Sequence, residues 1–243
     1  MGLLQVEKLC KSFGGLLALS DLDLTIEEGE ILGLIGPNGS GKTTFFNLLS
    51  GLIKPDKGEI LLSGKDITGM KPHKICRAGI ARTFQLVKPF TRMNPLENIM
   101  VGRAYGRERA VNREHAREEA EKILAFTGLI KKRVPKAGML NLIDRKRLEI
   151  ARALATRPKL LLLDEMMSGL NRAEIEDAML FVREIRDSGI AVIVVEHVMK
   201  AVLGISDRVV VLNVGRKIAE GTPRDIAENQ KVVEAYLGRE LYA

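Results

Sequence analysis

The stretch Gly36-Pro37-Asn38-Gly39-Ser40-Gly41-Lys42-Thr43 decides the fold that we predict for this chain. Its spacing, a glycine, four residues and then Gly-Lys-Thr, is typical of a loop that holds phosphate groups. The apolar run Ile31–Ile35 before it predicts a buried strand, and the run from Lys42 to Leu49 predicts a buried helix. Glycines let backbone N–H groups turn toward oxygen anions, and the helix N-terminus adds partial positive charge at the same place. The alternative is a glycine-rich turn that only joins a strand to a helix.

We therefore expect this loop to bind the phosphates of a nucleotide. Lys42 is expected to lie against the β- and γ-phosphates, and the Thr43 hydroxyl is expected to bind Mg²⁺. The predicted nucleotide-binding residues of this stretch are Gly36, Pro37, Asn38, Gly39, Ser40, Gly41, Lys42, Thr43 and Thr44.

Length and composition set broader limits. The chain has 243 residues, enough for one large domain or one domain with a subdomain. Its formal net charge of +7 agrees with acidic ligands, nucleic acid or an anionic membrane surface, and selects none of them. Cys10 and Cys76 have no metal-binding spacing, so we expect a reducing cytosolic setting. The sequence has no signal peptide and no apolar run of membrane-spanning length, so any membrane part is expected in another chain.

Two continuous apolar runs end in polar residues. Leu160–Leu163 is followed by Asp164 and Glu165, and Ile190–Val195 is followed by Glu196-His197. Such runs predict strands of a parallel sheet that is buried on both faces. In open α/β sheets, ligands bind at the carboxyl ends of the strands. We therefore expect these polar side chains to line a ligand site.

The expected roles follow from the chemistry of nucleotide hydrolysis. Asp164 is expected to bind Mg²⁺ opposite Thr43, and Glu165 to polarise an attacking water as general base. His197 could bond the γ-phosphate and orient Glu165 or the water, and a structural histidine at a strand end is the alternative. Gln85, at the end of the predicted strand Ile80–Gln85, could contact Mg²⁺ or the same water.

Two further features are open to more than one interpretation. Phe13, before Gly14-Gly15, could stack on a nucleotide base, and a core phenylalanine is the more ordinary alternative. The segment Pro95–Leu129 has a helical pattern with one apolar face and one heavily charged face. The charge indicates either a solvated helical surface or a docking surface.

Together these residues resemble the ATP-binding subunit of an ABC transporter, in order and over nearly the whole chain. Gly36–Thr43 is similar to the Walker A motif of that family, and Leu160–Asp164 followed by Glu165 is similar to its Walker B motif. Phe13 resembles the aromatic residue that stacks on the base. Gln85 in Thr83-Phe84-Gln85 resembles the Q-loop glutamine, Ser168–Asn171 the D-loop, and His197 the switch histidine.

A finer resemblance is to the ATPases of branched-chain amino acid importers. It rests on short stretches, namely Phe13–Leu16, Ala81–Gln85, Leu148–Arg152, Glu196–Met199, Gly221–Pro223 and Ala235–Gly238. Lipid exporters have similar ATPases and are the alternative within the family.

The signature motif departs from the family pattern. Leu-Ser-Gly-Gly-Gln is expected before the arginine-rich helix, and the chain has Leu140-Asn141-Leu142-Ile143-Asp144 there. Met166-Met167 also stands where a proline usually follows the glutamate. In the family this loop closes over ATP that is held by a facing subunit. The resemblance therefore implies that Asn141 and Ile143 contact that nucleotide, and the lost glycines put this contact in doubt.

The resemblance implies an α/β fold with a P-loop NTPase (RecA-like) core, a mostly parallel sheet, an N-terminal antiparallel β subdomain and an inserted α-helical subdomain. It implies one ABC ATPase domain over residues 1–243, with a nucleotide-binding core at 1–85 and 158–243 and a helical subdomain at 86–157. ATP and Mg²⁺ are the implied cofactors. The implied partners are transmembrane permease subunits, a second ATP-binding subunit and, indirectly, a substrate-binding protein, at the cytoplasmic face of the inner membrane.

Two other classes of function compete with a transport ATPase. The first is a soluble ABC-type ATPase that acts on nucleic acid or the ribosome. The chain has no room for a long coiled coil between Thr43 and Asp164, and it has one Walker A motif where translation factors carry two, so no nucleic acid is expected. The second is a binding module without turnover. The replacement of the signature glycines by Leu142 and Ile143 favours this class, and the presence of Lys42 argues against it.

Overall fold

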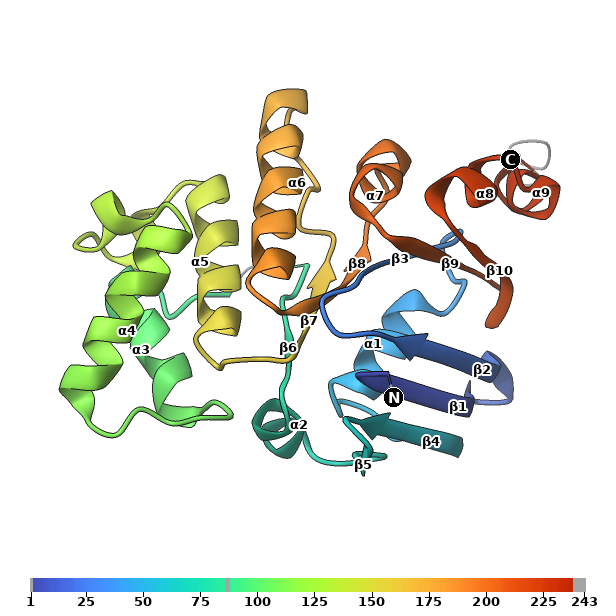
Figure 1. Ribbon diagram of the computed structural model, residues 1–243, viewed down its shortest axis with the longest axis horizontal. Helices are drawn as coiled ribbons and strands as arrows, with labels where there is room; N and C mark the ends of the chain where they lie inside the picture. The colour runs from blue at the N-terminus through green and yellow to red at the C-terminus, as the bar shows by residue number, and fades with distance from the viewer. Residues whose placement is uncertain (1, 86–87, 238–243) are drawn as a thin grey trace.

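The computed structural model describes residues 2–85 and 88–237 and contains two sheets flanked by helices (Figure 1). A six-stranded sheet has the order β10-β9-β3-β8-β7-β6. Its strands are β3 (Ile31–Ile35), β6 (Ile80–Arg82), β7 (Leu160–Asp164), β8 (Ala191–Val195), β9 (Arg208–Asn213) and β10 (Arg216–Gly221). All neighbours pair in parallel except β9 and β10, which form an antiparallel pair. Every residue of β3, β7 and β8 is buried, which explains their continuous apolar sequences.

The register of the parallel sheet aligns the ends of two strands. Asp164, the last residue of β7, lies opposite Val195, the last residue of β8. The residues that follow these strands therefore leave the sheet side by side, as the sequence predicts.

The second sheet is antiparallel and has the order β2-β1-β4-β5. Its strands are β1 (Leu4–Phe13), β2 (Leu16–Ile26), β4 (Lys57–Leu62) and β5 (Lys65–Asp66). Gly14 and Gly15, with φ of 53° and 86°, join β1 and β2 in a tight turn.

Helix α1 (Lys42–Leu49) packs against both sheets. Phe45, Phe46, Leu48 and Leu49 belong to one apolar cluster with side chains of the antiparallel sheet and of β3, β7 and β8. Helices α6 (Arg172–Asp187) and α7 (Met199–Ile205) belong to a second cluster with β7 and β8. This arrangement holds the start of α1 against the carboxyl edge of the parallel sheet.

The remaining helices form two groups toward opposite ends of the molecule, with one further helix between them (Figure 1). Helices α8 (Pro223–Ala227) and α9 (Gln230–Leu237) follow β10, and α2 (Pro72–Ala78) precedes β6. Helices α3 (Pro95–Tyr105), α4 (Arg113–Phe126) and α5 (Leu142–Leu154), with two short 3₁₀ turns at Ile130–Lys132 and Ala137–Met139, share an apolar cluster of their own. No helix among the described residues is long and apolar enough to cross a bilayer.

One detail differs from the sequence prediction. β6 ends at Arg82, so Gln85 lies in a loop beyond the strand and not at its end. The ladder stops because the Phe84 N–H donates to the Glu149 carboxylate at 3.2 Å and not to β7.

Candidate nucleotide site

The loop Gly36–Thr43 has the backbone that its glycines predict. Gly36, Gly39 and Gly41 have φ of 150°, 77° and 107°, which side-chain-bearing residues rarely adopt. A Cβ at Gly36 would lie 2.1 Å from a backbone oxygen of β9, whereas one at Gly39 would meet nothing within 4 Å. Close packing at the base of the loop therefore requires a glycine at position 36. At the tip of the loop, Gly39 faces open space.

The side chains of the loop divide between the interior and the surface. Lys42 is buried, and its Nζ donates to the carbonyl oxygens of Gly36 (2.6 Å) and Pro37 (3.0 Å). Ser40 is also buried, whereas Asn38 and Thr43 are exposed and Thr44 is half-buried. The ammonium group thus lies inside the curve of the loop, where a phosphate would be bound.

Phe13 lies at the end of β1 with 48% of its surface exposed. The interpretation of Phe13 as a core residue is therefore wrong. The Lys11 ammonium lies 5.5 Å from the centre of its ring. An exposed aromatic face leaves base stacking as the remaining prediction.

Glu165 is the centre of a three-residue cluster beyond β7. The Gln85 amide Nε2 donates to Glu165 Oε2 at 2.5 Å, and His197 Nε2 lies 2.8 Å from Oε1. The backbone of Glu165 has φ of 51°, a conformation that is strained for a residue other than glycine. Its N–H donates to Val195 at 2.9 Å, which fixes this turn against β8. The structure therefore brings together the three residues that the sequence proposes for catalysis.

The three predicted magnesium ligands line one cavity. Thr43, Gln85 and Asp164 contribute a hydroxyl, an amide and a carboxylate to the wall of a cavity of about 720 Å³. Oxygen atoms of these kinds are the ligands that Mg²⁺ prefers, so the residues fit this ion. Asp164 Oδ2 accepts a hydrogen bond from Arg82 at 2.7 Å.

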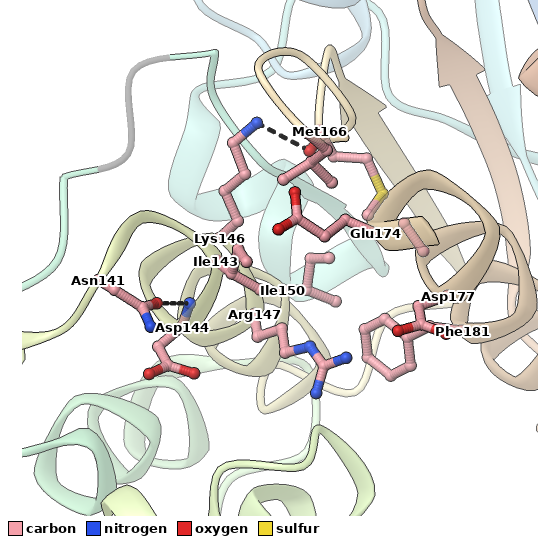
Figure 2. A pocket seen from close by; sticks show the side chains of 12 residues that line it. Asn141, Ile143, Asp144, Lys146, Arg147, Ile150, Met166, Glu174, Asp177 and Phe181 are labelled. Carbon is pink, nitrogen blue, oxygen red and sulfur yellow. Dashed lines mark hydrogen bonds between the residues drawn. The ribbon is translucent and has the colours of Figure 1, made fainter. Parts of the chain in front are cut away.

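The altered signature loop lies elsewhere, at the start of α5. Asn141 caps this helix, since its side chain accepts a hydrogen bond from the Asp144 N–H at 2.8 Å. Asp144 in turn lies 3.5 Å from the Lys132 ammonium, which offsets its charge. Asn141 and Ile143 line a second cavity, of about 290 Å³, between α5 and α6 (Figure 2). Neither residue lines the cavity of Thr43 and Asp164.

Comparison with known proteins identifies the family. Residues 19–168, more than half of the chain, match the family described as ABC transporter. The chain belongs to the ABC transporter family. Residues 216–242 also match the family described as branched-chain amino acid ATP-binding cassette transporter. Members of the ABC family hydrolyse ATP to drive transport, as the sequence predicts for this chain.

Several relatives match almost the whole of this ABC chain. The branched-chain amino acid transport ATP-binding proteins BraF of Pseudomonas aeruginosa and LivG of Escherichia coli K12 are 39% and 40% identical to it. In both comparisons the alignment covers 97% of this chain and 98% of the relative. The lipopolysaccharide export ATP-binding protein LptB of Haemophilus influenzae is 32% identical, with 99% of each chain covered.

Solved structures agree with this assignment. The ADP conformation of an ATP-binding cassette of an ABC transporter superposes with a TM-score of 0.88 at 34% identity, covering 98% of this chain and 99% of that one. A dimeric cassette bound to ADP and phosphate gives a TM-score of 0.80 at 26% identity, over 91% and 99%. The nucleotide-binding fold of this ABC subunit is therefore as predicted.

Two acidic residues hold the ends of the site loops, a role that the sequence analysis assigned to neither of them. Glu149, on α5, accepts hydrogen bonds from the N–H groups of Phe84 and Lys88, both at 3.2 Å, on either side of Gln85. Glu196 is 4% exposed and accepts from the Met167 N–H at 2.6 Å. Burial raises the pKa of both carboxyl groups, that of Glu196 to about 7. A single carboxylate directly next to apolar residues is the sequence signal that could have indicated both residues.

Lys146 is the third residue that the sequence analysis missed. Its ammonium donates to the carbonyl oxygens of Met166, at 3.0 Å, and Ser168. Burial lowers the pKa of this group. The helix that follows the altered signature loop is thereby fixed to the segment between Glu165 and the D-loop (Figure 2).

Proposed function

We propose that this ABC ATPase powers a membrane transporter that imports branched-chain, hydrophobic amino acids. The observation that carries hydrolysis is the Glu165 carboxylate held between Gln85 and His197 beside Asp164. The observation that supports the substrate class is the match of residues 216–242 to the branched-chain family, together with the identity to BraF and LivG.

The proposed chemistry uses these side chains as follows. Lys42 and the N–H groups of the glycine loop bind the ATP phosphates, and Phe13 stacks on the base. Thr43, Asp164 and Gln85 hold Mg²⁺, which neutralises charge on the phosphate oxygens when it is bound. Glu165 accepts a proton from the attacking water, and Gln85 and His197 keep its carboxylate oriented.

The proposed assembly has several chains. Two ATP-binding subunits meet head to tail, so that Asn141 and Ile143 of one face the nucleotide of the other. The exposed side chains Phe90 and Met93 lie between the Q-loop and α3 and contact a permease subunit at the cytoplasmic face of the inner membrane. Residues 86–157 act as the helical subdomain, and residues 1–85 and 158–243 as the core. A substrate-binding protein acts on the permeases and not on this chain.

Transport by the assembled complex tests this function. The subunit is purified with its membrane partners, reconstituted in vesicles with ATP on its own side, and supplied with a binding protein on the other. We expect ATP-dependent uptake of labelled leucine, isoleucine and valine, and loss of uptake with Glu165→Gln.

The same preparation separates the proposal from lipid export. ATP hydrolysis that is stimulated by a lipopolysaccharide or phospholipid, with no uptake of any branched-chain amino acid, contradicts the proposed substrate. It leaves the assignment of the ATPase itself intact, because hydrolysis is measured independently as phosphate release.

A further inference from the structure

Arg82, the last residue of β6, is a buried cation in the nucleotide site that none of the roles above includes. Its side chain is only 6% exposed. Its Nη2 donates to Asp164 Oδ2 at 2.7 Å, and its Nη1 donates to Asn47 Oδ1 at 2.7 Å and to Ser50 Oγ at 3.2 Å. One guanidinium group therefore joins the end of β7 to α1, the helix that begins with Lys42 and Thr43.

The contact leaves Asp164 in a defined orientation. Arg82 occupies Oδ2, and no hydrogen bond within residues 2–85 and 88–237 involves Oδ1. The contact is a single charge-assisted hydrogen bond, and it restricts the carboxylate because Asn47 and Ser50 hold the guanidinium itself in place. Oδ1 is the oxygen that we assign to a cation in the cavity that Thr43 and Asp164 both line.

The same guanidinium lies between two aromatic rings. Its carbon is 5.4 Å from the centre of the Phe46 ring and 5.0 Å from that of Phe84. Phe46 is fully buried in the core, whereas Phe84 is 47% exposed. Phe84 lines the cavity of about 720 Å³, together with Arg82 and Asp164. A displacement of Phe84 in that cavity therefore changes the stacking that holds Arg82.

We propose that Arg82 is a positioning residue for Asp164, and that its contact with Phe84 links magnesium binding to the state of the Q-loop. The fixed wall of this link is Phe46 with Asn47 and Ser50, and the movable wall is Phe84. The inference rests on the proposed role of Asp164 as a magnesium ligand.

Nucleotide affinity measured with and without Mg²⁺ tests this role. The ratio of ADP affinity in Mg²⁺ to that in EDTA is determined for the parent, Arg82→Lys and Asp164→Asn. We expect Arg82→Lys to lower the ratio by roughly tenfold, the usual size of an effect on metal affinity from a residue that orients a ligand. The affinity in EDTA is expected to stay within about twofold, because the glycine loop is untouched. A purely structural role would lower both affinities together.

The controls decide which idea fails. If Asp164→Asn leaves the ratio unchanged, Asp164 is not a magnesium ligand and the proposal falls with that role. If Asp164→Asn lowers the ratio to about one and Arg82→Lys leaves it at the parental value, only the role of Arg82 is wrong. Where Arg82→Lys does not fold, Asn47→Ala removes one partner of the guanidinium with Arg82 in place. Asn47→Ala is expected to lower the ratio, as Arg82→Lys does. An unchanged ratio overturns the proposal.

A double-mutant cycle with Phe84→Leu tests the link to the Q-loop. Leucine keeps an apolar side chain and removes the ring. We expect Phe84→Leu to lower the ratio. The double variant with Arg82→Lys is expected to have the same ratio as Arg82→Lys alone, because both changes break the same contact between the ring and the guanidinium. Additive effects would show that Phe84 does not act through Arg82.

Discussion

The strained conformation of Glu165 shows how single residues make this site. A left-handed backbone at the end of β7 turns its carboxylate toward Gln85 and His197, and the bond of its N–H to Val195 holds the turn. Gln85 and His197 approach the carboxylate from two other segments of the chain. Contacts within the chain alone therefore orient the carboxylate of the proposed base.

Glu165→Gln is expected to lower ATP hydrolysis by about 10²–10⁴, the usual contribution of a general base. Glutamine keeps the size of the side chain, so ATP affinity is expected to stay within about twofold. Phosphate release and nucleotide binding are measured on the same preparation. Glu176→Gln, which removes an exposed carboxylate on α6, is the matched control. Hydrolysis at the parental rate would exclude Glu165 as the base.

Glu196 makes the stability of the fold depend on pH. Burial raises its pKa from 4.5 to about 7, against the opposing effects of the Met167 N–H and the charge of Lys146. Below the unfolded pKa both states hold the proton. Between pH 4.5 and about pH 7, the unfolded state releases its proton while the folded state keeps it. The free energy of unfolding therefore falls, by about 3 kcal/mol in all.

Glu196→Gln removes this titration and keeps an oxygen acceptor for the Met167 N–H. We expect the variant to be more stable than the parent at about pH 8, and its advantage to shrink by about 2 kcal/mol at about pH 5.5. Urea unfolding at both pH values measures this, with the exposed Glu228→Gln as control. An advantage that is equal at both pH values would contradict the titration.

At the scale of elements, the parallel strands were predictable and their partners were not. Burial on both faces leaves an apolar run such as Leu160–Leu163, and parallel strands end at one edge, so the sequence predicts where Asp164 and Glu165 lie. The end of β6 depends on Glu149, which is 65 positions from Phe84 along the chain. The bond between Arg82 and Asp164 spans 82 positions. No local pattern records such pairings.

The start of α5 carries the altered signature. Leu142 is 53% exposed, and Asn141 already uses its side-chain oxygen to cap the helix. In the proposed dimer this loop lacks the glycine N–H groups that approach a phosphate closely. The helix N-terminus still presents N–H donors whatever its side chains are, which is the competing explanation.

Restoring glycine at Leu142 and Ile143 decides between these explanations. If the loop limits turnover, the ATPase rate of the assembled complex is expected to rise, by at most about 10²–10³, the usual effect of one donor in a transition state. Each glycine costs the helix up to about 1 kcal/mol, so folding is checked by thermal unfolding. The control, alanine at both positions, removes the bulk and keeps the Cβ. An unchanged rate in the folded, assembled complex rejects the idea.

At the scale of the whole molecule, the altered signature loop and the glycine loop line different cavities, and we propose that the signature loop meets the nucleotide of a second chain. The cavity of Asn141 and Ile143 lies between α5 and α6, and the cavity of Thr43 and Asp164 is separate from it. Glu165→Gln is therefore expected to accumulate an ATP-bound dimer, since binding continues and release by hydrolysis does not. Light scattering with ATP and with ADP measures the mass. A monomer under both conditions contradicts the shared site.

The docking surface is the other whole-molecule feature. We propose it over Gln85–Asn98, of which residues 86–87 lie outside the described part of the chain, as does Gly238 of the C-terminal resemblance. Phe90 and Met93 are 43% and 38% exposed. The Arg152 guanidinium, on α5, lies 4.7 Å from the centre of the Phe90 ring, so α5 contacts this surface through that ring.

Reversing a charge on this surface is expected to uncouple transport from hydrolysis. Arg92→Glu is a better variant than charge reversal at Glu97, because Glu97 is part of the capping box of α3 and its replacement also destabilises that helix. Like charges brought together at an interface cost several kcal/mol, so uptake by the reconstituted complex is expected to fall at least about tenfold. ATP binding by the isolated subunit is expected to stay within about twofold, since no residue of the nucleotide site is changed. Arg109→Glu makes the same charge change at another exposed position of the helical segment and serves as control. If both variants transport at the parental rate, the permease docks on a different surface.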